Sequence, residues 1–368
     1  MSVLPGGSAG DVAIDWNGRS LTYADLDTAI ADWPKQTVHD ASDLDVPDAL
    51  ICVFAAARQG AAVRVFDPQA RPDRPDIEDG AFLLVGTSGS TGNPRPLART
   101  AESWTSSFGE FTTLTGITSN DRVLLTGPLH ATMHLFAAVH ALWLGACVTD
   151  DVRHATVTHA VPAVLRTLVD HAPLLRIAIV AGTSLDDGAR ERAHKIRLVE
   201  YYGAAELSLV AARVVPEPLR LLHGIDADIR DGLLFVRSPY RVLGTDEWVG
   251  VGDLAELRPG GELVVHGRGS AAVNVGGATV VAEDVERVLD AIDGVSAAAV
   301  IGTPHAVLGE TVTAVIELST SGDLDAVKAE ARRVLRREAM PRRWTIVDEL
   351  PRTGSGKIAR GRVKDSYS

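Results

Sequence analysis

The stretch GTSGSTGNPRP at residues 86–96 follows the apolar run AFLLV and combines glycines, hydroxyl side chains and a basic residue in one loop. A plain surface turn needs only one or two glycines. Backbone N–H groups and hydroxyls crowded into a loop without bulky side chains are suited to wrapping phosphate groups. The loop is not a Walker A motif, because Gly92 is followed by Asn93 and Pro94 rather than by a lysine. The sequence therefore predicts a phosphate-binding loop of another type.

The composition is that of a globular protein with room for two domains. The chain has 368 residues, of which 46% are hydrophobic, and its net charge of -12 argues against a broad nucleic-acid surface. Cys52 and Cys147 lie in apolar runs and are expected to be buried, not part of a disulfide or zinc site. The N-terminus lacks a signal-peptide pattern, and the longest apolar run is too short to cross a bilayer. We therefore expect a cytoplasmic protein with no transmembrane segment and no nucleic-acid partner.

Helical and β-rich runs alternate up to about residue 200. Thr22 is expected to cap a helix that contains Leu26, and Gly60 is expected to form the turn between a helix and the strand AVRVFDP. The runs AFLLV, RVLLTGP and IAIVAG look like buried strands that end in glycine or polar loops. This order predicts α/β layering with functional loops at the strand ends.

The pattern changes after about residue 224. GLLFVRSPY, EWVGVGDLAEL and GELVVHGRG indicate antiparallel strands, and after GRGS at 267–270 a compact α+β unit is expected. Its two helices have apolar faces made of Val285, Val288, Leu289 and Ile292, and of Leu324, Val327, Val334 and Leu335. We predict an N-terminal domain over residues 1–269 and a C-terminal domain over residues 270–368.

Five stretches, in order, resemble the signatures of the adenylate-forming superfamily, in its acyl-CoA synthetase branch. The loop matches T-S-G-[ST]-T-G-x-P-K, although Arg95 stands where lysine is usual; the matching residues are Thr87, Ser88, Gly89, Ser90, Thr91, Gly92 and Pro94. The later matches are YYGAAE at 201–206, WVGVGDLAEL at 248–257, HGRGSAAVNVGGATVVAEDVE at 266–286 and PRTGSGKIAR at 351–360. The resemblance implies a large N-terminal α/β domain joined by a hinge to a smaller, mobile C-terminal α+β domain.

The resemblance also implies roles for individual residues. Lys357 would bridge the substrate carboxylate and the α-phosphate, and Glu206 would be the ligand of Mg²⁺. Ser270 is the implied hinge, and His130 and His134 are implied to lie at the acyl pocket. The loop facing the thiol would be Val275, Gly276 and Gly277. Contacts to ATP or AMP are implied for the loop at 87–92 and for Arg95, Gly182, Thr183, Tyr202, Gly203, Ala204, Asp253 and Arg268.

The implied activity is that of an AMP-forming carboxylate–CoA ligase that uses ATP, Mg²⁺ and coenzyme A. The implied substrate is a small-molecule carboxylic acid, which can be a fatty or other aliphatic acid or an aromatic acid such as o-succinylbenzoate. Loading of a carrier protein stays an alternative, as does a non-catalytic nucleotide-binding regulator, because five positions depart from the usual motifs: Arg95, Ala205, Val251, Ser270 and Thr279. The short region before the phosphate loop leaves open a simpler surface or a homodimer.

Overall fold

The computed structural model describes residues 3–72, 77–86, 96–181, 187–268, 272–275, 278–305, 309–337, 339–353 and 358–367. Its internal contacts divide the chain into unit 1, Met1–Ala227 with Val236–Val249, and unit 2, Asp228–Phe235 with Gly250–Ser368. The predicted boundary at Ser270 lies outside the described residues and stays a prediction. No helix in the described segments is long and apolar enough to cross a membrane.

The main sheet of unit 1 follows the strand order β13-β12-β11-β10-β9-β7-β8-β1-β2. Neighbours from β11 to β1 are parallel, whereas β12, β13 and β2 pair antiparallel. The central strands are buried along their whole length, as expected where both faces of a parallel sheet are covered. The strands are β1 (Val12–Trp16), β2 (Arg19–Thr22), β7 (Arg122–Leu125), β8 (Cys147–Thr149), β9 (Val157–Ala160), β10 (Ile177–Val180), β11 (Arg197–Ala204), β12 (Ser208–Val214) and β13 (Arg220–Leu221).

A second sheet of unit 1 has the order β3-β4-β5-β6. Strands β3 (Val38–Asp40), β4 (Ala62–Val65) and β5 (Leu83–Gly86) are parallel, and β6 (Pro96–Arg99) returns antiparallel to β5. The predicted strands AVRVFDP and AFLLV are thus confirmed as β4 and β5. Because β5 and β6 form a hairpin, both ends of the predicted phosphate loop belong to one sheet.

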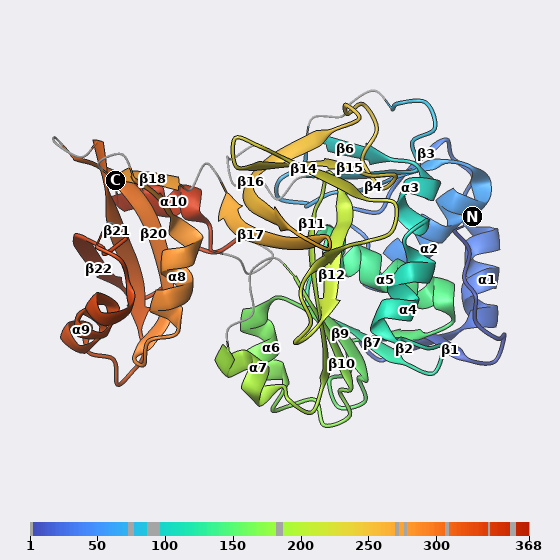
Figure 1. Cartoon of the computed structure of the whole chain (residues 1–368). Helices are drawn as coiled ribbons and strands as arrows, with labels where there is room; N and C mark the ends of the chain where they lie inside the picture. The colour runs from blue at the N-terminus through green and yellow to red at the C-terminus, as the bar shows by residue number, and fades with distance from the viewer. Residues whose placement is uncertain are drawn as a thin grey trace. The chain divides into compact units, whose positions relative to one another are not determined.

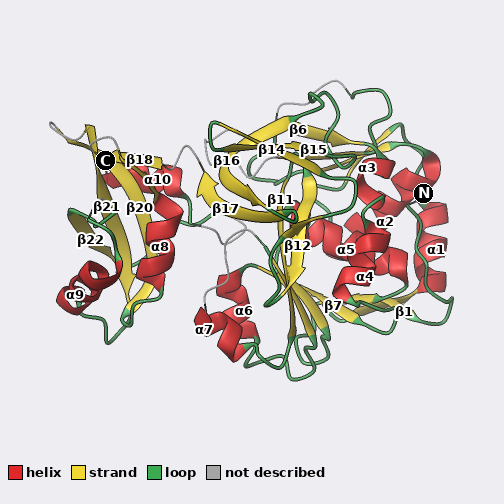
Figure 2. Ribbon diagram, viewed as in Figure 1, coloured by secondary structure: helices red, strands yellow, loops and turns green. Residues whose placement is uncertain are grey.

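Two predicted helix boundaries of unit 1, at Thr22 and Gly60, are confirmed. Thr22 caps α1 in a reciprocal capping box with Asp25, and Gly60 ends α2 in the left-handed conformation at φ 66°. Helices α1 and α2 pack side by side, and α5 lies against β7, β8 and β9 (Figures 1 and 2). The helices are α1 (Tyr23–Asp32), α2 (Val46–Gln59), α3 (Ala101–Thr105), α4 (Phe108–Thr115), α5 (Thr132–Leu144), α6 (Pro162–Leu168) and α7 (Asp187–Arg192).

Unit 2 contains the strands expected after residue 224 and the α+β unit that follows them. In the first group the order is β14-β15-β16-β17, and in the second it is β19-β18-β21-β20 with β22 on β21. The first group is β14 (Asp226–Arg230), β15 (Leu233–Arg237), β16 (Val249–Arg258) and β17 (Glu262–Arg268). The second is β18 (Ala272–Val275), β19 (Ala278–Val281), β20 (Val295–His305), β21 (Gly309–Leu318) and β22 (Arg343–Val347), with helices α8 (Ala282–Asp290), α9 (Leu324–Val334) and α10 (Arg360–Tyr367).

The two faces of the β20–β21 ribbon bury different helices. One face packs on α8 and α9 through a core that includes Val285, Leu289 and Val327, and the other packs on Val363 of α10. The predicted face of α9 was wrong at Val334, whose exposed fraction is 59%. Ala331 is buried instead, because it lies one helical turn after Val327 on the same side.

Candidate active site

The described ends of the predicted phosphate loop face each other across the β5–β6 hairpin. Gly86 is in register with Pro96, and Val85 with Leu97. The loop residues themselves lie outside the described part of the chain, so their contacts to phosphate stay predictions; they are Thr87, Ser88, Gly89, Ser90, Thr91, Gly92 and Arg95. The hairpin nevertheless requires the predicted loop to begin and end at one place, at the end of a buried strand.

The second motif lies where β11 turns into β12. Tyr202, Gly203 and Ala204 are the last residues of β11, and Glu206 lies in the turn that follows. A Cβ atom at Gly203 would lie 2.1 Å from the carbonyl oxygen of Ser208, so glycine is needed for the close approach of the two strands. The strands β7, β9, β10 and β11 are parallel, so this turn lies at the carboxyl edge of the sheet. Open α/β sheets bind their ligands at that edge.

A buried arginine that the sequence analysis missed joins these two motifs. Arg99, the last residue of β6, is 1% exposed. Its Nη2 donates a hydrogen bond to the carbonyl oxygen of Ala205 and its Nη1 donates one to that of Tyr240. Burial lowers the pKa of Arg99 to about 10, and the charge of Glu206 acts in the opposite direction. No local pattern marks this arginine, because it follows the loop as an ordinary strand residue.

The two histidines expected at the acyl pocket lie at the same edge, around the start of α5. His130 is half-buried, with its Nε2 3.8 Å from Oδ2 of Asp67, and burial lowers its pKa. His134 is 4% exposed, and burial lowers its pKa to about 4, so the ring is neutral at pH 7. A Cβ atom at Gly127 would lie 2.3 Å from the His134 ring, so that ring is closely packed.

A group of aromatic rings continues from α5 into the interior of unit 1. Phe136 contacts Trp104, Phe108 and Phe111 edge to face, and His140 contacts Phe108 and Phe111 in the same way. Such edge-to-face contacts are favourable arrangements of ring quadrupoles. The surroundings of the predicted acyl-pocket helix are therefore strongly apolar.

Unit 2 brings two of the predicted ribose contacts together. Asp253 on β16 is directly opposite Arg268 on β17 in the antiparallel register, and Asp253 is 7% exposed. Gly267 has φ 128°, and a Cβ atom there would lie 2.6 Å from Oε2 of Glu283 on α8. The segment before Arg268 is therefore packed closely on α8.

The C-terminal signature is anchored to the same helix. Arg352 and Ile358 form an isolated β-bridge, which closes the segment that contains the predicted catalytic lysine. Beyond it, Nη1 of Arg360 donates to Oε1 of Glu283 at 2.7 Å, and Nη2 donates to Oε2 of Glu286 at 2.5 Å. Two carboxylates of α8 therefore hold the start of α10.

Of the remaining predicted site residues, only Val275 lies in a described segment, as the last residue of strand β18. Val275 is buried in the core of unit 2. The other residues lie outside the described segments, so their roles stay predictions; they are Gly182, Thr183, Ser270, Gly276, Gly277 and Lys357.

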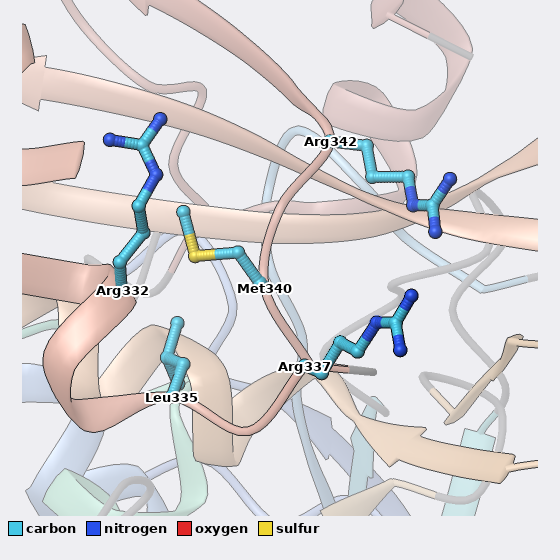
Figure 3. A pocket seen from close by; sticks show the side chains of 5 residues that line it. All are labelled: Arg332, Leu335, Arg337, Met340 and Arg342. Carbon is cyan, nitrogen blue, oxygen red and sulfur yellow. The ribbon is translucent and has the colours of Figure 1, made fainter. Parts of the chain in front are cut away.

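An open pocket of about 420 Å³ in unit 2 was not predicted. Three arginines, Arg332, Arg337 and Arg342, line it around the apolar side chains of Leu335 and Met340. In Figure 3 the guanidinium groups of Arg337 and Arg342 extend to the same side of Met340. The pocket thus offers several cationic donors next to an apolar surface, a combination that suits a phosphate-bearing ligand with an apolar part.

Two family models match the chain. Residues 69–273 match the AMP-binding enzyme, and residues 284–357 match the AMP-binding enzyme C-terminal domain. Among curated proteins, the chain is 31% identical over 343 residues to the uncharacterized acyl-CoA ligase YhfT of Bacillus subtilis, covering 81% of this chain and 70% of the relative. It is 28% identical over 364 residues to the salicylyl-CoA synthase / salicylate adenylyltransferase of a Streptomyces species, covering 81% of this chain and 65% of that protein.

The fold is also similar to that of a solved structure, o-succinylbenzoate CoA synthetase from Bacillus subtilis in complex with its acyl-adenylate intermediate. The TM-score is 0.82 at 20% sequence identity, and the match covers 96% of this chain and 95% of the other. At that identity the likeness concerns the fold.

Proposed function

The chain belongs to the AMP-binding enzyme family, and we propose that it is an AMP-forming acyl-CoA ligase that activates a small carboxylic acid with MgATP. The observation that carries this proposal is the direct bonding of the Glu206 turn to strand β6, through Arg99 and the Ala205 carbonyl. A carboxylate that can hold a metal is thereby tied to the strand that leaves the predicted phosphate loop.

In the first half-reaction, an oxygen of the substrate carboxylate attacks the α-phosphorus of ATP. The bond from that phosphorus to the bridging oxygen breaks, which gives an acyl-adenylate and pyrophosphate. The loop at 87–92 with Arg95 holds the departing phosphates, and Lys357 neutralises charge at the α-phosphate. The acceleration comes mainly from positioning and from fixed positive charge, since no protein nucleophile is needed.

A magnesium ion fits this arrangement through one carboxylate. Among the described residues, no three His, Cys, Asp or Glu side chains gather as a metal site. Glu206 would hold Mg²⁺ together with phosphate oxygens of ATP, which is the usual way in which this ion is bound at nucleotide sites. The ion would supply charge neutralisation for the leaving pyrophosphate.

The nucleoside is assigned to the residues around the strand ends. Tyr202, Gly203 and Ala204 would face the adenine together with Gly182 and Thr183. The backbone register that places Asp253 opposite Arg268 supports the assignment of both residues to the ribose, where a carboxylate can accept from two hydroxyls.

In the second half-reaction, a thiol attacks the carbonyl carbon of the acyl-adenylate and AMP leaves. We assign the thiol to coenzyme A. The arginine-lined pocket of unit 2 supports this choice, because coenzyme A carries phosphate groups, and a guanidinium group can donate two parallel hydrogen bonds to one phosphate. Rotation about Ser270 would exchange Lys357 for the loop at Val275, Gly276 and Gly277 between the two steps.

The acyl group is assigned as hydrophobic. The rings of Phe108, Phe111 and Phe136 around α5 support a fatty acid or an aromatic acid such as o-succinylbenzoate. His134, which is neutral at pH 7 and closely packed, would form part of the pocket wall, and His130 would lie at its entrance.

The deciding experiment is carboxylate-dependent exchange of labelled pyrophosphate into ATP, run with aliphatic acids of several lengths, o-succinylbenzoate and salicylate. We expect exchange with one group of acids, and AMP release on adding free coenzyme A. AMP release only with a holo carrier protein would redirect the second step to carrier loading. If no acid supports exchange while ATP still binds, the result would favour a non-catalytic nucleotide-binding regulator over a ligase.

A further inference from the structure

We propose that Arg99 is a positioning residue for the first half-reaction, which holds the turn of Glu206 in place relative to strand β6, the strand that follows the predicted phosphate loop. The inference rests on the proposed function, since it assigns Arg99 to the same site. Arg99 is buried, and it acts on Glu206 through a hydrogen bond to the backbone of the turn.

The side chain of Arg99 is buried in the interior of unit 1. An ionised guanidinium in the interior is costly unless its donors are satisfied, so a buried arginine needs bonds that compensate for desolvation. Arg99 donates to the carbonyl oxygens of Ala205 and Tyr240, and its guanidinium carbon lies 5.5 Å from the centroid of the Trp104 ring, whereas its buried Nε has no hydrogen-bond partner among the described residues. These contacts fix the orientation of the guanidinium group, because its planar fork presents the donors at set angles.

Backbone hydrogen bonds around Arg99 join strand β6, the segment at 240–243 and the turn of Glu206. The N–H of Leu243 donates to the carbonyl oxygen of Ala98 at 2.8 Å, and the N–H of Val242 donates to that of Glu206 at 3.0 Å. The segment at 240–243 therefore binds both β6 and the turn of Glu206, and Arg99, which lies on β6, bonds to that segment and to that turn. A movement of Glu206 relative to β6 would break several of these bonds together.

Arg99 is also close in the chain to the predicted phosphate loop, which precedes strand β6. Pro96, the residue in register with Gly86 at the described end of that loop, begins the same short strand that ends at Arg99. Ala205 contributes only its carbonyl oxygen to Arg99, so the orientation of the turn depends on a main-chain bond. The turn and strand β6 are consequently held at a fixed spacing, which a triphosphate and its metal require.

The test compares Arg99→Lys and Arg99→Met with the wild-type full-length chain. Lysine keeps the charge but can reach only one of the two carbonyls at a time, and methionine keeps approximate volume while removing the charge. Arg176→Met is the matched control, because Arg176 also joins segments of unit 1, through Nε to Oδ1 of Asp121 at 2.9 Å, but lies at the amino edge of the parallel strands. Each protein is assayed for thermal unfolding, for the Mg²⁺ concentration that half-saturates pyrophosphate exchange, and for calorimetric binding of ATP with and without Mg²⁺.

We expect Arg99→Lys to fold but to unfold at a lower temperature than the wild type, because one buried carbonyl loses its donor. Mg·ATP should bind about tenfold more weakly, the effect of losing one charged hydrogen bond that positions the turn. Arg99→Met should lose more, and Arg176→Met should lower the unfolding temperature without changing the Mg²⁺ requirement. The inference is overturned if Arg99→Lys binds Mg·ATP as tightly as the wild type, or if both Arg99 variants fail to fold, which would make the residue purely structural. Absence of exchange in the wild type would overturn the proposed function alone, since calorimetry still measures the effect of Arg99 on nucleotide binding.

Discussion

Replacing Glu286 by glutamine should stabilise unit 2 at alkaline pH. The carboxylate of Glu286 on α8 accepts a hydrogen bond from the N–H of Val300 at 2.7 Å and is paired with Arg360. Glu283, on the same helix, shares that arginine. One guanidinium therefore serves two carboxylates in a partly buried cluster. Burial raises the pKa of Glu286 to about 7, although Arg360 acts against the increase.

The magnitude follows from the difference between the ordinary pKa of 4.5 and the value of about 7. At about 1.36 kcal/mol per pH unit, that difference corresponds to about 3 kcal/mol. Because the folded-state pKa is the higher one, the folded chain holds this proton more tightly than the unfolded chain. The stabilisation is present in full below about pH 4.5 and is lost as the pH rises through about 7. Glutamine imitates the protonated carboxyl, so it removes this loss.

The assay is urea unfolding of the full-length chain at pH 5, 6, 7 and 8. Incorporation of fluorotryptophan lets unit 2 be followed by itself, since Trp344 is its one tryptophan in the sequence. Glu286→Gln should exceed the wild type in unfolding free energy by about 1 kcal/mol or less at pH 5 and by about 3 kcal/mol at pH 8. Glu330→Gln is the control, because Glu330 forms an exposed pair with Arg333 on α9 and should give no such trend.

A lower stability of Glu286→Gln than of the wild type at pH 8 would refute this reasoning. It would mean that the attraction between the ionised carboxylate and Arg360 outweighs the cost of burial. An equal gain at all four pH values would also refute it, since the effect would then be independent of the proton.

Three further substitutions test the site. Lys357→Ala should reduce pyrophosphate exchange by orders of magnitude and leave thiolysis of a supplied acyl-adenylate intact, and an equal loss of both steps would contradict the exchange of residues between half-reactions. Gly203→Ala should raise the KM for ATP and lower the unfolding free energy by about 1–3 kcal/mol, because the new Cβ atom meets the Ser208 carbonyl; an unchanged KM would separate this turn from the nucleotide. Gly127→Ala should cost about 1–3 kcal/mol in urea unfolding through contact with the His134 ring, and should change the ranking of acids in the exchange assay.

Structural features that depend on a few neighbouring residues were predicted well. The cap at Thr22, the left-handed Gly60 and the alternation of helices with buried strands all follow from neighbouring residues in the chain. Periodicity was less informative at the end of α9, where Val334 extends into solvent while Ala331 fills the core. A helix has more apolar positions than its partner surface can cover, and only packing selects among them.

By itself, the sequence determined the family, through five motifs in a fixed order, and it marked Glu206, Asp253 and Arg268 as residues of interest. Only the tertiary structure decided how those motifs are held. Arg99 reaches carbonyl groups 106 and 141 positions away, and Arg360 reaches carboxylates 74 and 77 positions away. A side chain's partner across such a separation depends on how strands and helices pack, which no pattern of neighbouring residues records.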